Sequence, residues 1–563
     1  MPAQTFHTLL TEVSPSAKSG SAAITIPAAG STPAVHLDYN KLNDYVGAFA
    51  NALKTSGVQG GQVVSLSLVN SLEFVGAFLS TGWLRAVSAP LNPAYSQDEI
   101  EFYLTDTKSS ILIVKAGETS DDKPTLKAAK KCGVKVVSVK LSSGQSGKVE
   151  VDLKTVFDPS AGGAKKSGGI ANKDQQQGGP VQEQDVALVL HTSGTTGRPK
   201  AVPLTHLNIM TTMANIVKTY EFTPKDRGLL VMPLFHVHGL VAGLLAPLLS
   251  GSSVVIPTKF SAGSFWKDFV SESCTWYTAV PTIHSILLSS PLPNPLPKIR
   301  FIRSCSSSLS PTVFHKLEDT FKAPVLEAYA MSEAAHQMCA SPLPKNGPRY
   351  PGSVGIPQGV GLSIRNADNG KEIKTKGEQG RGEVCIRGKN VMLGYVNNDK
   401  ANKEGYWNAE EKDAQGAKEK RWFRTGDEGY LTEKGYLVLT GRLKELINRG
   451  GEKISPIELD SAILALPLVS EAVTFGVADE KYGEKVWAAV IIKDAGGKSD
   501  SQIEKELKAA LNGKIAKFKT PERIIITKAI PKTATGKIQR RHVRDQFVKQ
   551  EAEKAKKQRQ SKL

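Results

Sequence analysis

The stretch TSGTTGRPK, from Thr192 to Lys200, determines how the rest of this sequence is interpreted. It follows the apolar run VALVLH, which predicts a buried strand ending at His191. Glycines permit turns that aim successive backbone N–H groups into one concavity, which suits a phosphate. Hydroxyls add donors, and Lys200 adds a positive charge. The alternative is an ordinary surface turn rich in Ser, Thr and Gly. The spacing G-x-x-x-x-G-K-[ST] of a Walker loop does not occur, so the stretch predicts a phosphate cradle of another kind.

Size and charge restrict the classes of protein that fit. A chain of 563 residues predicts three or four structural units, and 40% hydrophobic residues are ample for a large core. No run of 18 apolar residues occurs, so we expect no transmembrane helix. Five scattered cysteines indicate reduced thiols. The net charge of +18 fits nucleic acid, a membrane surface or anionic substrates such as ATP and CoA.

The order of sequence patterns predicts the domain organisation. Residues 20–140 alternate short apolar runs with helical patterns, which is typical of a parallel sheet covered by helices. Residues 142–183 are rich in Gly, Gln, Ser and Lys, so we expect a flexible surface excursion with a short structured piece in its middle. Beyond Gly352, short glycine-rich strands predict a small β unit. From about Lys444 the pattern becomes compact α+β, with a basic helix expected over Ser501–Lys517.

Four further stretches follow in a fixed order. They are YAMSE (329–333), RWFRTGD (421–427), GRLKELINRGGEKISPIELD (441–460) and PKTATGKIQRR (531–541). Together with Thr192–Lys200 they resemble the adenylate-forming superfamily of acyl-CoA synthetases, luciferases and adenylation domains of peptide synthetases. The resemblance implies an α/β fold with three parts: a large domain of layered sheets plus a β unit (1–443), a small mobile α+β domain (444–540) and a basic tail (541–563).

The resemblance also implies a reaction in two steps. ATP and a carboxylate give an acyl-adenylate and pyrophosphate, and the CoA thiolate then displaces AMP. Lys537 would offset the charge that develops at the α-phosphate, and His236 and Glu333 would share in catalysis. Glu333 would hold Mg²⁺, Tyr329 would offer a flat face to adenine, and Asp427 and Arg442 would bind the ribose or phosphate. The expected ATP-binding residues are Thr192, Ser193, Gly194, Thr195, Thr196, Gly197, Lys200, Tyr329, Ser332, Asp427, Arg442 and Lys537.

The second step is expected to use another part of the small domain. Arg449, Gly450 and Gly451 match the loop that faces CoA, and two glycines let a narrow pantetheine chain pass close to the backbone. In the family the small domain rotates between the two steps. Lys444 falls at the position of the hinge.

The acid pocket is unusually polar. His236, His238, Ser306 and His336 match its positions, and a hydrocarbon tail would leave such donors unsatisfied at roughly 1–3 kcal/mol each. His236 also fits a role in orienting any carboxylate, and a His238 satisfied by backbone is an open alternative. The sequence departs from the family at Ala330 and at Ser304–Ser308, where Gly and a Gly-Ala-Ala-Pro-like loop are usual. The stretches that contain these pocket residues resemble those of the oxalyl-CoA synthetases of plants and fungi, including the fungal peroxisomal CoA synthetase. The resemblance implies oxalate, with a medium-chain fatty or aromatic, coumarate-like acid next.

The last residues predict location and a second partner. Ser561, Lys562 and Leu563 form S-K-L, an address read by the peroxisomal import receptor, so we expect a peroxisomal enzyme, with a cytosolic pool left open. From Arg540 onward the chain has nine Lys or Arg against three Asp or Glu, which motivates weak, electrostatic RNA binding, although such a tail is usually only a solvated helix end. A pseudoenzyme scaffold is a third class. The complete set Lys200, Glu333, Asp427, Arg442 and Lys537 argues against it.

Overall fold

The computed structural model describes residues 4–30, 32–143, 148–159, 170–172, 174–177, 179–192, 199–407, 421–533 and 536–560. The predicted phosphate-loop residues Ser193–Gly197 and the targeting residues Ser561, Lys562 and Leu563 lie outside these ranges. Within them, no helix is both long and apolar enough to cross a membrane.

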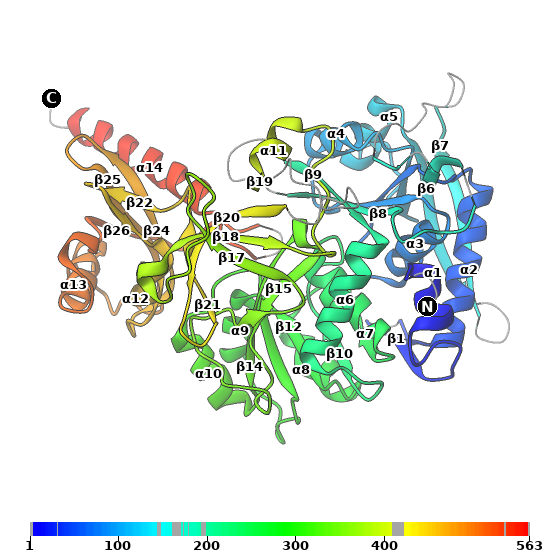
Figure 1. Cartoon of the computed structure of the whole chain (residues 1–563), viewed down its shortest axis with the longest axis horizontal. Helices are drawn as coiled ribbons and strands as arrows, with labels where there is room; N and C mark the ends of the chain where they lie inside the picture. The colour runs from blue at the N-terminus through cyan, green and yellow to red at the C-terminus, as the bar shows by residue number, and fades with distance from the viewer. Residues whose placement is uncertain are drawn as a thin grey trace.

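The first sheet has seven strands in the order β7-β6-β5-β3-β4-β8-β9. Its inner strands pair in parallel, as the alternation of apolar runs and helical patterns predicts, whereas β7 and β9 close the two edges in antiparallel fashion. The strands are β3 (Val63–Ser67), β4 (Val87–Pro90), β5 (Ile111–Lys115), β6 (Lys135–Ser143), β7 (Val149–Phe157), β8 (Val186–Thr192) and β9 (Lys200–Thr205), and the helices α2 (Tyr39–Thr55), α3 (Leu72–Trp83), α4 (Gln97–Asp106) and α5 (Pro124–Cys132) lie against them (Figure 1).

The structured piece inside residues 142–183 is more extensive than the composition predicts. Strand β7 spans nine residues and pairs with β6 from Ser143↔Val149 to Val136↔Phe157. Alternate residues of β7 lie half-buried against α2, which explains the V-x-V-x-L alternation within an otherwise polar stretch.

The second sheet holds the ends of the strands that build the site. Its order is β16-β15-β14-β13-β12-β10-β11-β1-β2, and β10 to β14 are parallel. The strands are β1 (Ala22–Ile26), β2 (Val35–Asp38), β10 (Arg227–Leu230), β11 (Ser253–Val255), β12 (Trp276–Ala279), β13 (Phe301–Cys305), β14 (Val325–Met331), β15 (His336–Ala340) and β16 (Ile356–Pro357); the helices include α6 (His206–Tyr220), α8 (Ala262–Ser271), α9 (Pro281–Leu288) and α10 (Pro311–Phe321). The carboxyl ends of parallel strands are where α/β sheets bind ligands.

The predicted β unit is present as an antiparallel sheet of five strands. They are β17 (Gly361–Arg365), β18 (Gly382–Arg387), β19 (Tyr406–Trp407), β20 (Trp422–Leu431) and β21 (Leu437–Arg442). The pair β20–β21 places Asp427 directly opposite Arg442. The chain leaves this sheet at an exposed turn that contains Lys444.

The C-terminal domain is an α+β unit around the strands β23-β22-β25-β24, with β26 beside β25 (Figure 1). Its elements are β22 (Ile447–Arg449), β23 (Glu452–Ile454), α12 (Pro456–Leu464), β24 (Val469–Asp479), β25 (Gly483–Ile492), α13 (Asp500–Leu511), β26 (Arg523–Ile526) and α14 (Arg540–Gln560). Helix α13 ends at Leu511, so the helix predicted to reach Lys517 is shorter. A short 3₁₀ turn takes up Lys517–Lys519.

The basic C-terminal segment begins inside this domain. The side chains of Val543 and Phe547 in α14 are buried together with Val473 and Phe475 of β24. The first two turns of α14 therefore belong to the domain core and do not form a separate tail from residue 541.

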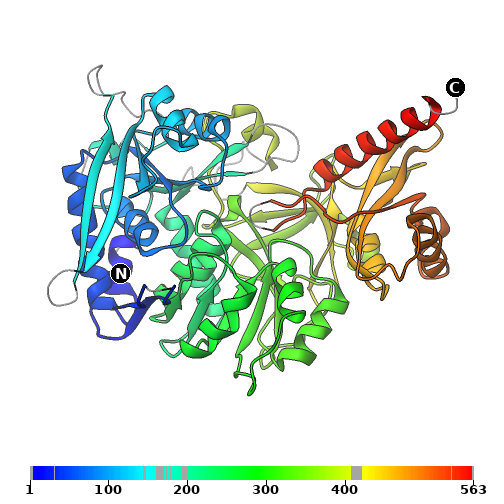
Figure 2. The same ribbon diagram turned by 180° about the vertical axis from the view of Figure 1, so that it is seen from behind.

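Contacts at Ser455 and at Gly536 help to join the C-terminal domain to the rest of the molecule. The Ser455 hydroxyl, which caps α12 by accepting a hydrogen bond from the Glu458 N–H at 3.1 Å, also donates to the carbonyl of Thr440 in β21. Gly536 lies against Thr282 and Val280, at the junction of β12 and α9. Figure 2 shows the segment before α14 extending from the C-terminal domain toward the strands of the second sheet. Lys537 lies in this segment, next to Gly536.

Candidate active site

The ends of the predicted phosphate loop are held side by side. Thr192, the last residue of β8, pairs in antiparallel register with Lys200, the first residue of β9, so these two ends lie opposite each other. The Lys200 ammonium lies 4.7 Å from the ring centroid of Tyr395. Tyr395 in turn donates a hydrogen bond to Glu333 Oε1 at 2.8 Å.

Glu333 is a buried carboxylate beside cations. It follows β14 in a short 3₁₀ turn, Ser332–Ala334, that also contains the half-buried Ser332. Burial raises the pKa of Glu333, while its hydrogen bond from Tyr395 and the charges of Arg442 and Lys200 oppose that shift. A carboxylate in this position is a hard oxygen donor of the kind that divalent cations such as Mg²⁺ prefer.

Asp427 links the second sheet to the β unit. Its carboxylate accepts a hydrogen bond from the Tyr329 hydroxyl and lies 3.2 Å from Arg442 Nε. Tyr329 is at the end of β14, so the predicted nucleotide residues from two sheets meet here. The nearby Asp427 charge raises the pKa of Arg442.

Lys537 reaches this group from the C-terminal domain. Its turn is closed by hydrogen bonds between its backbone and Thr533. Burial and the Arg442 guanidinium lower the pKa of Lys537, and Asp427, Glu445 and Glu333 partly oppose the effect. Burial, and then the charge of Lys537, lower the pKa of His236 to about 4. His236 is therefore neutral near pH 7. Its Nδ1 accepts the His238 N–H at 3.2 Å, which leaves the proton on Nε2.

The predicted acid-pocket residues are brought together. His238 Nδ1 lies 3.0 Å from Ser306 Oγ, and the His238 and His336 rings lie 5.6 Å apart. The side chain of His336 is fully buried, and neither ring nitrogen has a hydrogen-bond partner within the described part of the chain. Ser306 (φ 73°) and His336 (φ 125°) both adopt positive φ, which is uncommon for residues other than glycine and clusters at functional sites.

His238 is bonded to side chains rather than to backbone, which answers the alternative left open by the sequence. Its Nε2 lies 2.6 Å from Thr278 Oγ1 of β12. Ala330, the departure from glycine in YAMSE, is half-buried in β14 opposite Gln337.

Sequence motifs missed three residues of the site: Tyr395, Thr278 and the buried Arg303 of β13. Tyr395 stands in GKNVMLGY, which reads only as part of the β unit. The sequence does carry a signal for Arg303, because it is the charged residue in FIRSC, a run that is otherwise uncharged and that forms a buried strand. Thr278 carried none.

The predicted CoA residues lie apart from this group. The Arg449 guanidinium donates to the Phe518 carbonyl and lies 5.1 Å from the Tyr482 ring, and Gly450 N–H bonds to Tyr482. These partners all belong to the C-terminal domain. Gly450 and Gly451 do have the positive φ that the glycine pair predicts.

The arrangement separates two functions. Around Glu333, the cations Lys200, Arg442 and Lys537 favour a polyphosphate and would stabilise charge at a phosphorus under attack. Beside Lys537, the neutral His236, the buried His336 and the half-buried Ser306, which His238 contacts, offer hydrogen bonds to a carboxylate. A carboxylate could thus be held next to an α-phosphate, which is the geometry that acid activation needs.

Comparison with known proteins agrees with this chemistry. Residues 18–396 match the model of the AMP-binding enzyme family, and residues 458–537 match the AMP-binding enzyme C-terminal domain. The chain is 46% identical to an oxalate–CoA ligase of Saccharomyces cerevisiae (92% of this chain, 94% of the relative) and 45% identical to an oxalate–CoA ligase of Arabidopsis thaliana (91% and 94%). Among solved structures, ATP-bound MatB from Rhodopseudomonas palustris superposes with a TM-score of 0.79 at 27% identity, over 97% of this chain and 99% of that one.

Proposed function

Because this chain belongs to the AMP-binding enzyme family, and is within it an AMP-forming acid–CoA ligase, we propose that its acid substrate is oxalate. The observation that carries the proposal is the acid pocket: His336 is fully buried, and within the described ranges both its ring nitrogens lack partners, beside Ser306 and His238. An apolar tail would leave the N–H of the His336 ring and the hydroxyl hydrogen of Ser306 without acceptors, at roughly 1–3 kcal/mol each. A second carboxylate would accept hydrogen bonds from them. The relatives named oxalate–CoA ligases support the same substrate.

In the first half-reaction one carboxylate oxygen of oxalate attacks the α-phosphorus of ATP, and the bond to pyrophosphate breaks. The ammonium of Lys537 and the guanidinium of Arg442 offset the charge that develops there, and His236 orients the attacking carboxylate through Nε2–H. In the second, the CoA sulfur forms a bond to the acyl carbon as the bond to AMP breaks. Arg449–Gly451 would face CoA after the small domain rotates about Lys444.

We include Mg²⁺ in the proposal. Glu333 would hold it, because this buried carboxylate uses Oε1 to accept from Tyr395 and is surrounded by groups that suit a nucleotide phosphate. When bound, the ion would neutralise charge on the phosphate oxygens.

A fatty or aromatic acid is the alternative substrate. His236 fits it equally well, since orienting a carboxylate requires nothing of the tail. The buried His336, whose ring nitrogens have no partner among the residues that the structure describes, favours oxalate over this alternative.

The test is CoA-dependent pyrophosphate release with ATP and Mg²⁺ from oxalate, malonate, octanoate and a cinnamate-type acid. We expect strong preference for oxalate in the wild type, lost in His336→Ala and Ser306→Ala without change in the KM for ATP. Preference for octanoate would keep the reaction class and overturn the substrate.

Two expectations for the C-terminal residues stay predictions. We propose peroxisomal residence from S-K-L; a fluorescent fusion at the N-terminus should colocalise with a peroxisomal marker and lose this on deletion of Ser561–Leu563. RNA binding would show affinity that falls steeply with salt. Because Val543 and Phe547 are core residues, the deletion that tests it should begin after Phe547. Unchanged RNA affinity after that deletion would contradict it.

A further inference from the structure

Arg303 is a buried guanidinium whose contacts are all neutral. It lies in β13 with 1% of its surface exposed. Nε donates to the Tyr220 hydroxyl at 2.8 Å, Nη1 to Thr278 Oγ1 at 3.2 Å and Nη2 to Gln337 Oε1 at 3.3 Å. Among the residues that the structure describes, no carboxylate forms an ion pair with it. Burial opposes the charged form of Arg303, and its interactions with Tyr220 and Cys305 raise its pKa.

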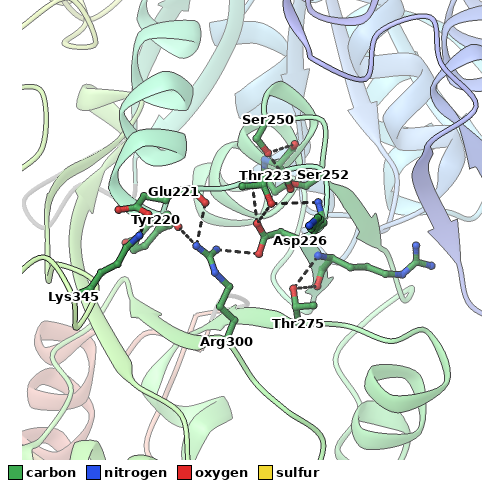
Figure 3. Close-up of polar contacts among 12 residues, drawn as sticks. Tyr220, Glu221, Thr223, Asp226, Ser250, Ser252, Thr275, Arg300 and Lys345 are labelled. Atoms are coloured by element: carbon green, nitrogen blue, oxygen red, sulfur yellow. Dashed lines mark hydrogen bonds and ion pairs between the residues drawn. The ribbon is translucent and has the colours of Figure 1, made fainter.

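The neighbouring Arg300, in contrast, forms an ion pair with a carboxylate of the protein. Three residues earlier in the chain, its guanidinium lies 3.0 Å from Asp226 and donates to the carbonyls of Tyr220 and Glu221 (Figure 3). Removing a cation from water costs several kcal/mol unless an opposite charge compensates. Arg300 has that charge in the protein itself. Arg303 does not, so its environment favours an anion brought by a ligand.

A chain of hydrogen bonds leads from Arg303 to the acid pocket. A guanidinium can only donate, so Thr278 Oγ1 accepts from it and directs its own hydrogen to His238 Nε2, 2.6 Å away. Burial and the Arg303 charge hold the pKa of His238 well below its usual range, so the ring is neutral and its proton lies on Nδ1. Nδ1 donates to Ser306 Oγ at 3.0 Å. The hydroxyl hydrogen of Ser306 is thereby left for a ligand.

The same charge reaches the second pocket histidine. Burial and Arg303 hold the pKa of His336 well below its usual range, so its ring too is neutral and has one N–H to donate. His238 and His336 are thus both neutral, and Arg303 is the permanent positive charge next to them.

We propose that Arg303 is a positioning residue that selects a substrate with a second carboxylate: through Thr278 and His238 it orients the Ser306 hydroxyl as a donor, and its charge attracts the distal carboxylate. This inference rests on the proposed function, since it explains how the pocket would distinguish oxalate from an acid with a neutral tail.

The experiment compares oxalate with oxamate, which has the same size but carries a neutral amide in place of one carboxylate. ATP–pyrophosphate exchange gives KM and kcat for each acid in wild type, Arg303→Met and the matched control Arg300→Met. We expect Arg303→Met to raise the KM for oxalate about 30-fold, to leave the KM for ATP unchanged and to abolish the preference for oxalate over oxamate. Arg300→Met should keep that preference.

Three further variants separate positioning from a structural role. Thr278→Val interrupts the hydrogen-bond chain but leaves the charge, so we expect a smaller rise in the oxalate KM, about 10-fold. If the two act as one chain, the double variant should be no worse than Arg303→Met alone. Arg303→Lys should recover part of the preference, and Thr278→Val also provides the test if Arg303→Met does not fold.

Two results are informative in different ways. An unchanged oxalate-to-oxamate ratio in Arg303→Met and Thr278→Val, or equal losses with both acids, would overturn the role of Arg303 while leaving oxalate as the substrate. A wild type that activates octanoate and not oxalate would instead overturn the proposed function.

Discussion

At the scale of single residues, Tyr395 connects the two ends of the phosphate site. Its ring lies under the Lys200 ammonium and its hydroxyl donates to Glu333, so one side chain orients both a cation and a carboxylate. A buried carboxylate that loses a donor is left with part of its hydrogen bonding unmade. Tyr395 should therefore matter for nucleotide binding although it lies in no recognised motif.

Tyr395→Phe tests this point, because it removes the hydroxyl and keeps the ring beneath Lys200. We expect about a 10-fold rise in the Mg²⁺-ATP concentration needed for half-maximal adenylation, with the KM for oxalate little changed. Tyr406→Phe is the control, since that hydroxyl is also buried but donates to the Met392 carbonyl at 2.8 Å and not to Glu333. Equal nucleotide dependence in the two variants would contradict the role.

Glu327 makes a separate prediction about stability. It is buried next to β13, and burial raises its pKa from the ordinary 4.5 to about 8. The unfolded chain therefore releases this proton at lower pH than the folded chain. The stability that Glu327 contributes is complete below pH 4.5 and is lost as the pH rises toward 8, at up to about 1.4 kcal/mol for each pH unit.

Glu327→Gln should remove that loss. We expect the melting temperature of the wild type to fall from pH 5 to pH 8 more than that of the variant. Glu383→Gln, which breaks a buried pair with Arg424, should lower the melting temperature at both pH values. If the melting temperatures of wild type and Glu327→Gln change in parallel with pH, the Glu327 carboxyl is already ionised in the folded protein.

At the scale of elements, the turn before α14 is the part of the C-terminal domain that enters the site. Gly536 has φ 79°, and a Cβ there would lie 2.8 Å from Thr282 Oγ1 and 3.2 Å from Val280 Cγ2. The glycine in TATGK thus serves two purposes: it permits the turn and it permits close approach to the junction of β12 and α9.

Gly536→Ala should consequently displace Lys537 from the site. We expect slower adenylation, by about 10-fold or more, with thioester formation from supplied acyl-adenylate retained. Gly513→Ala separates backbone strain from contact, because Gly513 has nearly the same φ, 78°, and open space around it. If both variants adenylate at the same reduced rate, the contact is not the cause.

How much of the site the sequence could predict depends on whether a residue lies in a contiguous motif. Lys200, Glu333, Asp427 and Lys537 lie in local signatures, and the structure brings all four together although they span more than 300 residues. Arg303 belongs to no signature. Its role depends on the side chains of Tyr220, Thr278 and Gln337, distant in sequence, that surround its guanidinium, and a one-dimensional pattern does not contain that information.

At the scale of whole elements, the sequence pattern predicts the inner strands well and the strand β7 and the helix α14 poorly. The inner parallel strands are continuous apolar runs, so they were predictable. In the edge strand β7, apolar and polar residues alternate inside a polar, glycine-rich stretch. Pairing with β6 stabilises this strand, so composition alone underestimates its length. The helix over α14 was expected to be solvated, but two apolar residues one turn apart, Val543 and Phe547, fix it to β24.

For the whole molecule, Lys537 lies with Arg442 and His236, which is the arrangement that we propose for the first half-reaction. Lys537→Ala should lower adenylation by orders of magnitude, whereas thioester formation from supplied acyl-adenylate should stay largely intact. Separate assays of pyrophosphate release and of adenylate consumption by CoA would measure this. Equal loss in both would contradict the assignment of Lys537 to one step.

The double use of the Ser455 hydroxyl has a consequence for how the domain can turn. The oxygen accepts from Glu458 N–H and donates to the Thr440 carbonyl, and the two bonds use different parts of the same group. Separation of the domains would break only the donated bond, and water could replace it. The first turn of α12 would stay capped throughout, so the small domain can leave and return as an intact body without partial unfolding at its boundary.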